Sequence, residues 1–359
     1  MYYEGGLFMN IFFYRTGWAL LLYMLYEPEW EKTFYCFQSI NQVPAYFVEK
    51  KIKYFAFREN CNNSNKFKWL IGRVKDELRY WNFVSRLRKE NGKHCFGDDD
   101  SLLSKPFIDS DFVVVEDGLA NYTPNNIKWL QKIGLLGHGC KYRVMGFDPI
   151  IHKVLLSGAF AVPDEMCEKA KCIDVKKAWN NKNDDEKEKI LKVFNTKAQD
   201  LEQYNGNYVL LTQNYDSYDV ESKEDEYSRY LKILENYPAG EVVIKPHPAS
   251  TFDYRKYFPY YKVVKQGIPF ELMELYNNYK VLISINSTAA FTVPGKKVID
   301  LYDIDGNLKK RYTVNGNQKI SAGEVEDLVP KVKENPKTIK SQIKDIYYYL
   351  LRKCLWKLD

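Results

Sequence analysis

The stretch that decides the fold is Val242-Val243-Ile244-Lys245-Pro246-His247-Pro248. Its β-branched residues predict a buried strand, and the first proline ends that strand because proline cannot continue a central ladder. Each proline also restricts the residue before it to extended geometry. We therefore expect His247 on a stiff backbone at the carboxyl end of a strand, where open α/β sheets bind ligands. Taken alone, the motif is equally compatible with a strand-ending turn that carries an incidental histidine.

A second buried strand is predicted at Val281–Ile285, and Asn286-Ser287-Thr288 follows it directly. Hydroxyls at a strand-to-helix junction can cap the helix, and the free amides there attract an anion such as phosphate. A plain N-cap is the simpler role. Between the two strands, Ile268-Pro269-Phe270-Glu271 begins a predicted helix. Glu271 would either complement the helix dipole or bind the two hydroxyls of a ribose.

A third candidate site lies upstream, where the strand signal Asp111–Val115 runs into Glu116-Asp117-Gly118. A carboxylate at the end of a strand, before a glycine that allows a tight turn, suits a catalytic base. An ordinary acidic turn is the alternative for this motif by itself.

Strands and helices alternate along most of the chain, which favours parallel sheets with helices on both faces. A length of 359 residues suggests two domains. We therefore expect an α/β protein with two doubly wound, Rossmann-like domains that face a central cleft. The expected segments are a first domain over 1–155, an inter-domain passage over 156–200, a second domain over 201–335 and a C-terminal amphipathic helix over 336–359.

Composition excludes several classes of function. The net charge of +6 comes without dense Lys/Arg blocks interleaved with aromatics, so we expect no nucleic-acid partner. The seven cysteines include no Cys-x-x-Cys pair, which argues against zinc and fits reduced thiols in a cytoplasm. The apolar run Trp18–Leu25 is too short to span a bilayer and is interpreted as the first helix of a nucleotide-binding domain.

The C-terminal stretch 339–358 is predicted to be a basic, aromatic, amphipathic helix. Such a helix can lie on an anionic membrane, which would place the protein on the inner face of the plasma membrane. Packing of the helix across the first domain is an equal alternative. A homodimer is also compatible with the sequence.

Together, Glu116-Asp117-Gly118, Lys245-Pro246-His247-Pro248 and Ser287-Thr288 resemble, in this order, the signature of bacterial sialyltransferases. The second half is particularly similar to the capsule and lipo-oligosaccharide sialyltransferases of glycosyltransferase family 52. That similarity extends from Leu211-Thr212-Gln213 to Ser287-Thr288 and covers about half of the chain. The residues after Pro248 depart from the pattern, so they carry no inference about the acceptor.

The resemblance implies a GT-B fold, an inverting mechanism, CMP-sialic acid as donor, an oligosaccharide acceptor that ends in galactose, and neither metal nor cofactor. The first domain would take the acceptor and the second the CMP-sugar. Asp117 would be the general base. His247 would protonate or hydrogen-bond the departing phosphate, and as a cationic imidazole it would lower the barrier electrostatically. The other residues placed at the substrates are Glu116, Gly118, Gln213, Lys245, Pro246, Pro248, Glu271 (ribose), Asn286, Ser287 and Thr288 (phosphate).

Three alternatives remain open from the sequence. A related capsule glycosyltransferase could use another donor, such as CMP-Kdo, because the same motifs serve any CMP-sugar. A metal-dependent UDP-sugar transferase would use the acidic cluster Asp98-Asp99-Asp100 to hold Mn²⁺ or Mg²⁺. A non-enzymatic polysaccharide-binding protein with a degenerate nucleotide fold is the third.

Overall fold

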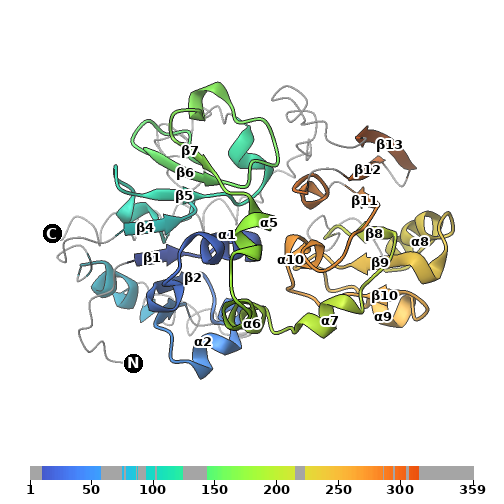
Figure 1. The fold of residues 1–359 in the computed structure, drawn as a ribbon, viewed down its shortest axis with the longest axis horizontal. Helices are drawn as coiled ribbons and strands as arrows, with labels where there is room; N and C mark the ends of the chain where they lie inside the picture. Colours follow the sequence, from blue (N-terminus) through green and yellow to red (C-terminus); the bar gives the residue numbers. More distant parts are fainter. Residues whose placement is uncertain are drawn as a thin grey trace. The chain divides into compact units, whose positions relative to one another are not determined.

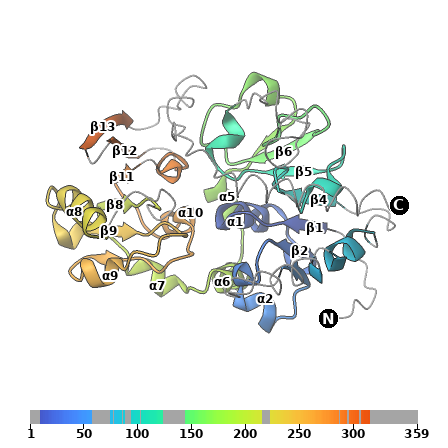
Figure 2. The ribbon, with the colours of Figure 1, turned by 180° about the vertical axis from the view of Figure 1, so that it is seen from behind.

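The computed structural model divides the described chain into two compact units. The first contains the described residues up to Leu156 together with Pro163–Cys172, and the second contains Ser157–Val162 and the described residues from Ile173 onward. Each unit is built on its own sheet (Figure 1), and Figure 2 shows the same two sheets from behind. The described residues are 10–57, 75–76, 78–85, 87, 94–101, 103–123, 144–214, 223–285, 287–293, 296–304 and 307–314.

The first unit has a parallel sheet of seven strands in the order β3-β2-β1-β4-β5-β6-β7. The chain starts in the middle at β1, moves outward to β3, returns to β4 on the other side of β1 and continues to β7. This is the doubly wound order, and its direction reverses between β1 and β4, which pair in parallel. Strand ends beside such a switch point form the ligand-binding edge of a sheet. The strands are β1 (Asn10–Phe13), β2 (Phe34–Phe37), β3 (Tyr54–Ala56), β4 (His94–Gly97), β5 (Val113–Val115), β6 (Lys153–Leu156) and β7 (Ala170–Cys172).

Both faces of the first sheet are buried. Phe12 packs on Tyr23 of helix α1 (Gly17–Tyr26), with ring centroids 4.6 Å apart. The next residue, Phe13, packs on Phe107 at 5.2 Å. Successive side chains of a strand point to opposite faces, so the two rings anchor two different layers. The apolar run predicted as the first helix is therefore α1. A second short helix of this unit is α2 (Ala45–Glu49).

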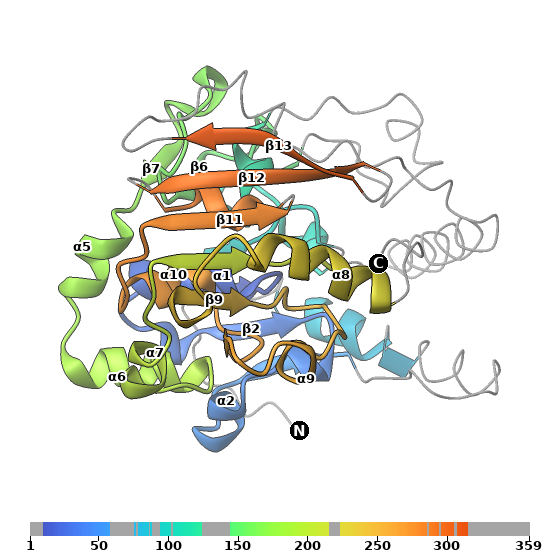
Figure 3. The same cartoon turned by 90° about the vertical axis from the view of Figure 1, so that its right-hand side faces the viewer.

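The second unit repeats the doubly wound order in a sheet arranged β10-β9-β8-β11-β12-β13. The strands from β10 to β12 pair in parallel, and β13 pairs antiparallel to β12. Figure 3 shows β11, β12 and β13 next to one another. The switch point here lies between β8 and β11. The strands are β8 (Tyr208–Leu211), β9 (Val242–Lys245), β10 (Lys262–Val263), β11 (Val281–Ile285), β12 (Lys297–Ile304) and β13 (Asn307–Val314).

Helices also cover both faces of the second sheet. Helix α8 (Lys223–Leu234) and the aromatic segment 252–258 share one buried cluster with residues of β8, β9 and β11. Helix α10 (Phe270–Glu274) lies on the other side of these strands (Figure 1). It begins at Phe270, as the sequence predicts, and is five residues long. The other helices of this unit are α5 (Val175–Asn180), α6 (Asp184–Val193), α7 (Ala198–Glu202) and α9 (Tyr254–Tyr257).

In the part of the chain that the structure describes, no helix combines the length and the apolar character needed to cross a bilayer. The C-terminal helix predicted over 336–359, including the membrane-contact stretch 339–358, lies outside the described residues. Asn286 also lies outside them.

Candidate active site

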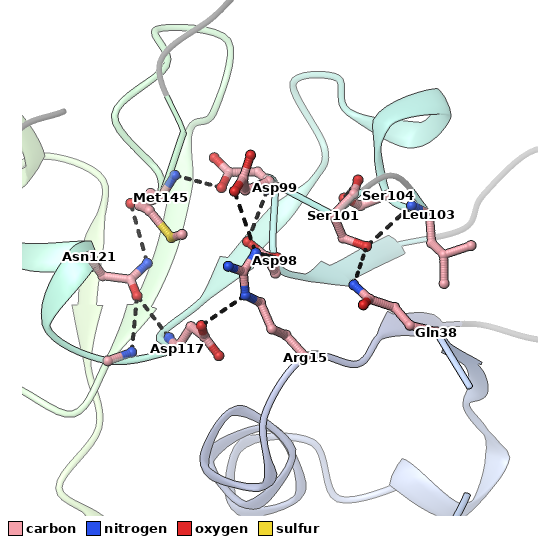
Figure 4. Close-up of polar contacts among 12 residues, drawn as sticks. Arg15, Gln38, Asp98, Asp99, Ser101, Leu103, Ser104, Asp117, Asn121 and Met145 are labelled. Carbon is pink, nitrogen blue, oxygen red and sulfur yellow. Dashed lines mark hydrogen bonds and ion pairs between the residues drawn. The ribbon is translucent and has the colours of Figure 1, made fainter. Parts of the chain in front are cut away.

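At the carboxyl edge of the first sheet, the Arg15 guanidinium contacts carboxylates from two other strand ends (Figure 4). Arg15 follows β1, Asp98 and Asp100 follow β4, and Asp117 follows β5. The Arg15 Nη1 atom lies 2.6 Å from Asp98 Oδ2 and 3.5 Å from Asp100 Oδ2. Its Nε atom lies 3.2 Å from Asp117 Oδ2. The cluster therefore forms beside the switch point, where the doubly wound order predicts a ligand.

One oxygen of Asp117 remains without a partner. Oδ2 lies against Arg15, whereas Oδ1 is buried and has no hydrogen-bond partner among the described residues. The turn itself is fixed by Asn121, whose Oδ1 accepts the amide hydrogens of Asp117 at 2.8 Å and Gly118 at 3.3 Å. Gly118 has a backbone φ of 149°, which residues other than glycine rarely adopt. The turn thus fixes the backbone that carries Asp117, whose Oδ2 lies against Arg15 and whose Oδ1 is buried without a hydrogen bond to the described residues.

The environment of Asp117 tunes its proton affinity. Burial and the charge of Asp98 together raise the pKa of Asp117 to about 6, although a hydrogen bond with Thr16 and the charge of Arg15 act in the opposite direction. Burial also raises the pKa of Asp98, against the stabilising effect of Arg15. Burial disfavours the charge on Arg15, but the surrounding carboxylates outweigh this and raise the pKa of its guanidinium. A carboxylate that gains and loses its proton near neutral pH is suited to general base catalysis.

Asp99 points away from this cluster. Its two carboxylate oxygens accept the amide hydrogens of Met145 at 2.6 Å and Gly146 at 2.9 Å (Figure 4). Asp98, in contrast, points to Arg15. The three consecutive aspartates therefore do not converge, and across the described ranges no group of three or more His, Cys, Asp or Glu side chains is placed to hold a metal ion.

Glu116 lies on the core side of the same turn. It has no exposed surface. Its carboxylate accepts hydrogen bonds from Trp18 Nε1 at 3.2 Å and from the Tyr122 hydroxyl at 2.7 Å. In this structure Glu116 joins the end of β5 to helix α1, which positions its neighbour Asp117.

In the second unit, His247 lies directly after β9. Its amide donates to Thr212 Oγ1 at 3.0 Å, and its Nδ1 accepts the amide hydrogen of Ala249 at 3.1 Å. Because a neutral imidazole carries one N–H, these bonds place the ring proton on Nε2. Burial lowers the pKa of His247, and the nearby charge of Lys245 lowers it further. In its neutral form, a ring held in this way would donate through Nε2; the cationic imidazole stays a prediction.

Lys245, two residues before His247, and Glu271 are both buried. The Lys245 Nζ atom donates to the carbonyl oxygen of Pro246 at 2.8 Å. Burial lowers the pKa of Lys245 to about 8, and the charge of Glu271 acts in the opposite direction. Glu271 is 7% exposed and accepts a hydrogen bond of 2.8 Å from Thr292 Oγ1. At neutral pH Lys245 thus contributes positive charge next to Pro246 and His247.

The predicted capped helix after β11 is a short 3-10 turn, η8 (Thr288–Phe291). Ser287 precedes it and makes no capping hydrogen bond with its side chain. Instead, Ser284 Oγ accepts the Ser287 amide hydrogen at 2.9 Å and donates to the Ser287 carbonyl oxygen at 3.1 Å. Ser284 is fully buried and holds the turn in place. The partly buried Ser287 therefore lies at the edge of a fixed 3-10 turn rather than at the start of a capped helix.

Gln213 and Pro248 complete the set of predicted residues in this unit. The Gln213 amide donates to the Tyr230 hydroxyl at 3.0 Å, directly after β8. Pro248 is exposed next to His247. Gln213, Pro246, His247 and Ser287 thus all follow strands β8, β9 or β11 at the carboxyl edge of the second sheet.

Arg15 and Asn121 belong to the candidate site, although no sequence motif marks them, and Thr212 lies at the start of the stretch that resembles the family. The sequence signal for Arg15 is position, because it lies two residues after β1, the first strand of its unit. Asn121 is recognisable afterwards as an amide side chain four residues after Asp117.

The sequence profile of glycosyltransferase family 52 matches residues 36–308, about three quarters of the chain. The chain belongs to glycosyltransferase family 52. An uncharacterized protein of Haemophilus influenzae is 29% identical over 195 residues, which are 53% of this chain and 61% of that protein. The matched region thus spans less than two thirds of this relative.

Two solved bacterial structures resemble the fold. The GT-B domain of a Photobacterium damselae sialyltransferase is 15% identical, with a TM-score of 0.50 over 80% of this chain and 89% of that one. A 2,6-sialyltransferase from a Photobacterium species is 14% identical, with a TM-score of 0.55 over 82% of this chain and 71% of that one. Together with the two doubly wound units, these similarities show a fold of the GT-B type with two Rossmann-like domains.

Proposed function

We propose that this glycosyltransferase is an inverting sialyltransferase that transfers sialic acid from CMP-sialic acid to a hydroxyl of a galactose-terminated glycan. The observation that carries the proposal is the Asp117 carboxylate, fixed by Arg15 through one oxygen and unbonded at the other. The family and the ordered motifs support the same activity. The structurally similar 2,6-sialyltransferase has been solved with CMP as donor product and lactose as acceptor substrate, and lactose ends in galactose.

On this proposal, the acceptor oxygen attacks the anomeric carbon of sialic acid while the bond from that carbon to the phosphate oxygen breaks. Asp117 Oδ1 takes the proton of the acceptor hydroxyl. CMP leaves with the bonding electrons, and its phosphate receives a hydrogen bond from His247 Nε2. Lys245 adds positive charge beneath the loop, which stabilises the departing phosphate electrostatically. A single displacement of this kind inverts the anomeric configuration.

The remaining roles rest on the family resemblance and on position. Ser287 and Thr288 would bind the phosphate of the donor, and Glu271 would bind its ribose. The phosphate diester carries one negative charge, so the protein groups suffice and we expect no metal requirement. We further propose that the reaction serves capsule or lipo-oligosaccharide synthesis in the bacterial cytoplasm.

The direct test measures CMP release from CMP-sialic acid in the presence of EDTA, with and without lactose. Release that depends on lactose, with a sialylated product by mass spectrometry, is the expected result. Release from CMP-Kdo but not from CMP-sialic acid would change the donor. Turnover of a UDP-sugar that requires Mn²⁺ would overturn the proposal, and CMP binding without turnover of any donor would favour the non-enzymatic alternative.

A further inference from the structure

Gln266 contacts the loop 246–250, which carries His247. Its Nε2 atom donates to three main-chain carbonyl oxygens, those of His247 at 3.1 Å, Pro248 at 3.0 Å and Ser250 at 2.7 Å. Gln266 lies beyond β10, the strand that pairs with β9. The side chain therefore links two neighbouring strand ends through a single nitrogen.

The convergence of three carbonyl groups on one atom is the informative feature. Carbonyl oxygens repel one another unless a donor lies between them, and a primary amide offers two hydrogens to share among the three. Gly267 follows directly and has φ of 92°, so the chain turns sharply there. Gln266 itself is exposed. The three recorded bonds of this side chain all go to one short segment.

The same segment determines where the imidazole lies. From the sheet side, Thr212 Oγ1 accepts the His247 amide hydrogen. Within the loop, the amide of Ala249 donates to His247 Nδ1, and the amide of Ser250 donates to the His247 carbonyl oxygen. The Gln266 side chain adds the hydrogen bonds to the loop carbonyl oxygens of His247, Pro248 and Ser250. With these contacts together, the backbone and one ring nitrogen of His247 are fixed, and Nε2 is left to donate.

We propose that Gln266 is a positioning residue for His247, which keeps the His-Pro loop in the conformation that directs Nε2 to the leaving phosphate. This inference rests on the proposed function, since it assumes that His247 acts on the donor. Gln266 contacts no reacting atom in this role. Its effect is expected in turnover, because displacements of about 1 Å in a catalytic group can cost roughly 100-fold in rate.

The test uses Gln266→Glu, which keeps the shape of the side chain but replaces the donor by an acceptor. The matched control is Lys265→Gln, a change in the adjacent exposed residue, whose Nζ donates to the carbonyl oxygen of Asn195. Both changes are made in the wild-type and in the His247→Ala background, and kcat and donor KM are measured for each. Melting temperatures check that all four variants fold.

In the wild-type background, we expect Gln266→Glu to lower kcat about 10- to 100-fold and to change the donor KM less than about threefold, while the control stays near wild type. In the His247→Ala background the same substitution should cost less than about twofold, because coupled residues are not additive. The proposal is overturned if Gln266→Glu lowers kcat less than about threefold in the wild-type background. It is also overturned if the substitution lowers kcat by the same factor in the His247→Ala background.

A measurement without turnover separates this inference from the proposed function. Wild-type protein that fails to use CMP-sialic acid would refute the proposed function. In that case amide hydrogen exchange of Ala249 and Ser250 decides on Gln266, since protection reports local opening. Gln266→Ala should raise their exchange rates at least about tenfold over Lys265→Ala. Equal rates would show that Gln266 does not hold the loop.

Discussion

Replacing Arg15 by glutamine removes the cation that lies against Asp117 and leaves a shorter, uncharged side chain. The guanidinium contacts Asp98 at 2.6 Å, Asp100 at 3.5 Å and Asp117 at 3.2 Å. Without it, the carboxylates repel one another with less compensation. The carboxylate of Asp117 then binds its proton more tightly, so the pKa of the proposed base rises from about 6. A base must be ionised to accept a proton, and the variant should therefore lose activity on the acidic side.

The size of the shift follows from the distance. An ion pair at 3.2 Å is worth about 1.3 kcal/mol in water and about 5 kcal/mol at an effective dielectric constant of 20. One pKa unit corresponds to about 1.4 kcal/mol. Asp98 loses the same partner and would also bind a proton, which removes part of the repulsion and favours the lower end of this range. We expect the pKa of Asp117 to rise by about 1 to 2 units, which lowers its ionised fraction at pH 7 about two- to tenfold.

The assay is kcat/KM for lactose-dependent CMP release between pH 6 and pH 9.5. In Arg15→Gln the acidic limb of the profile should move to higher pH by about 1 to 2 units, and activity at pH 9 should approach that of wild type. Asp100→Asn should shift the limb slightly the other way, and the exposed Lys32→Gln is the neutral control. An unchanged limb in Arg15→Gln would refute the reasoning.

The other predictions concern the base, the histidine and a buried ion pair. Asp117→Asn should lower transfer at least about 100-fold while CMP affinity by calorimetry is unchanged; a smaller loss would exclude Asp117 as the base. His247→Gln retains an N–H donor and should keep about tenfold more activity than His247→Ala, and equal rates would contradict a donating Nε2. Lys296→Met leaves the largely buried Glu274 carboxylate, 3.0 Å from Lys296 Nζ, without its cation. This should lower the free energy of unfolding by about 3 kcal/mol in urea denaturation, whereas a change below about 0.5 kcal/mol would show that the carboxylate is solvated.

The alternation of apolar strands and helices was sufficient to predict both doubly wound units. The pattern works because central parallel strands are buried on both faces and consist of apolar runs. Edge strands lack this signal, so β7 and β10 could not be read from the sequence. β7 (Ala170–Cys172) has a largely exposed pattern and β10 is two residues long. The structure also replaces the capped helix expected after Ser287 with a 3-10 turn, because the buried Ser284 hydroxyl takes the Ser287 amide hydrogen.

The same reasoning separates the site residues that sequence could find from those it could not. Asp117 and His247 carry recognisable chemistry within short motifs. Arg15 acts through carboxylates that are distant in sequence, and Gln266 acts through main-chain carbonyl groups that every residue possesses. Asp99 belongs to an acidic run typical of metal sites, and in the structure its carboxylate accepts the amide hydrogens of Met145 and Gly146.

The junction between β1 and α1 leaves no room for a change in chain length. Phe13 ends the strand, Arg15 reaches the carboxylates, and Thr16 begins the helix by accepting the Ala19 amide hydrogen. An insertion or deletion of one residue here would either move the Arg15 guanidinium away from its carboxylate partners or break the N-terminal cap of helix α1. Among natural or engineered variants of this chain, loop-length diversity should therefore be found elsewhere, and this junction should accept substitutions but not indels.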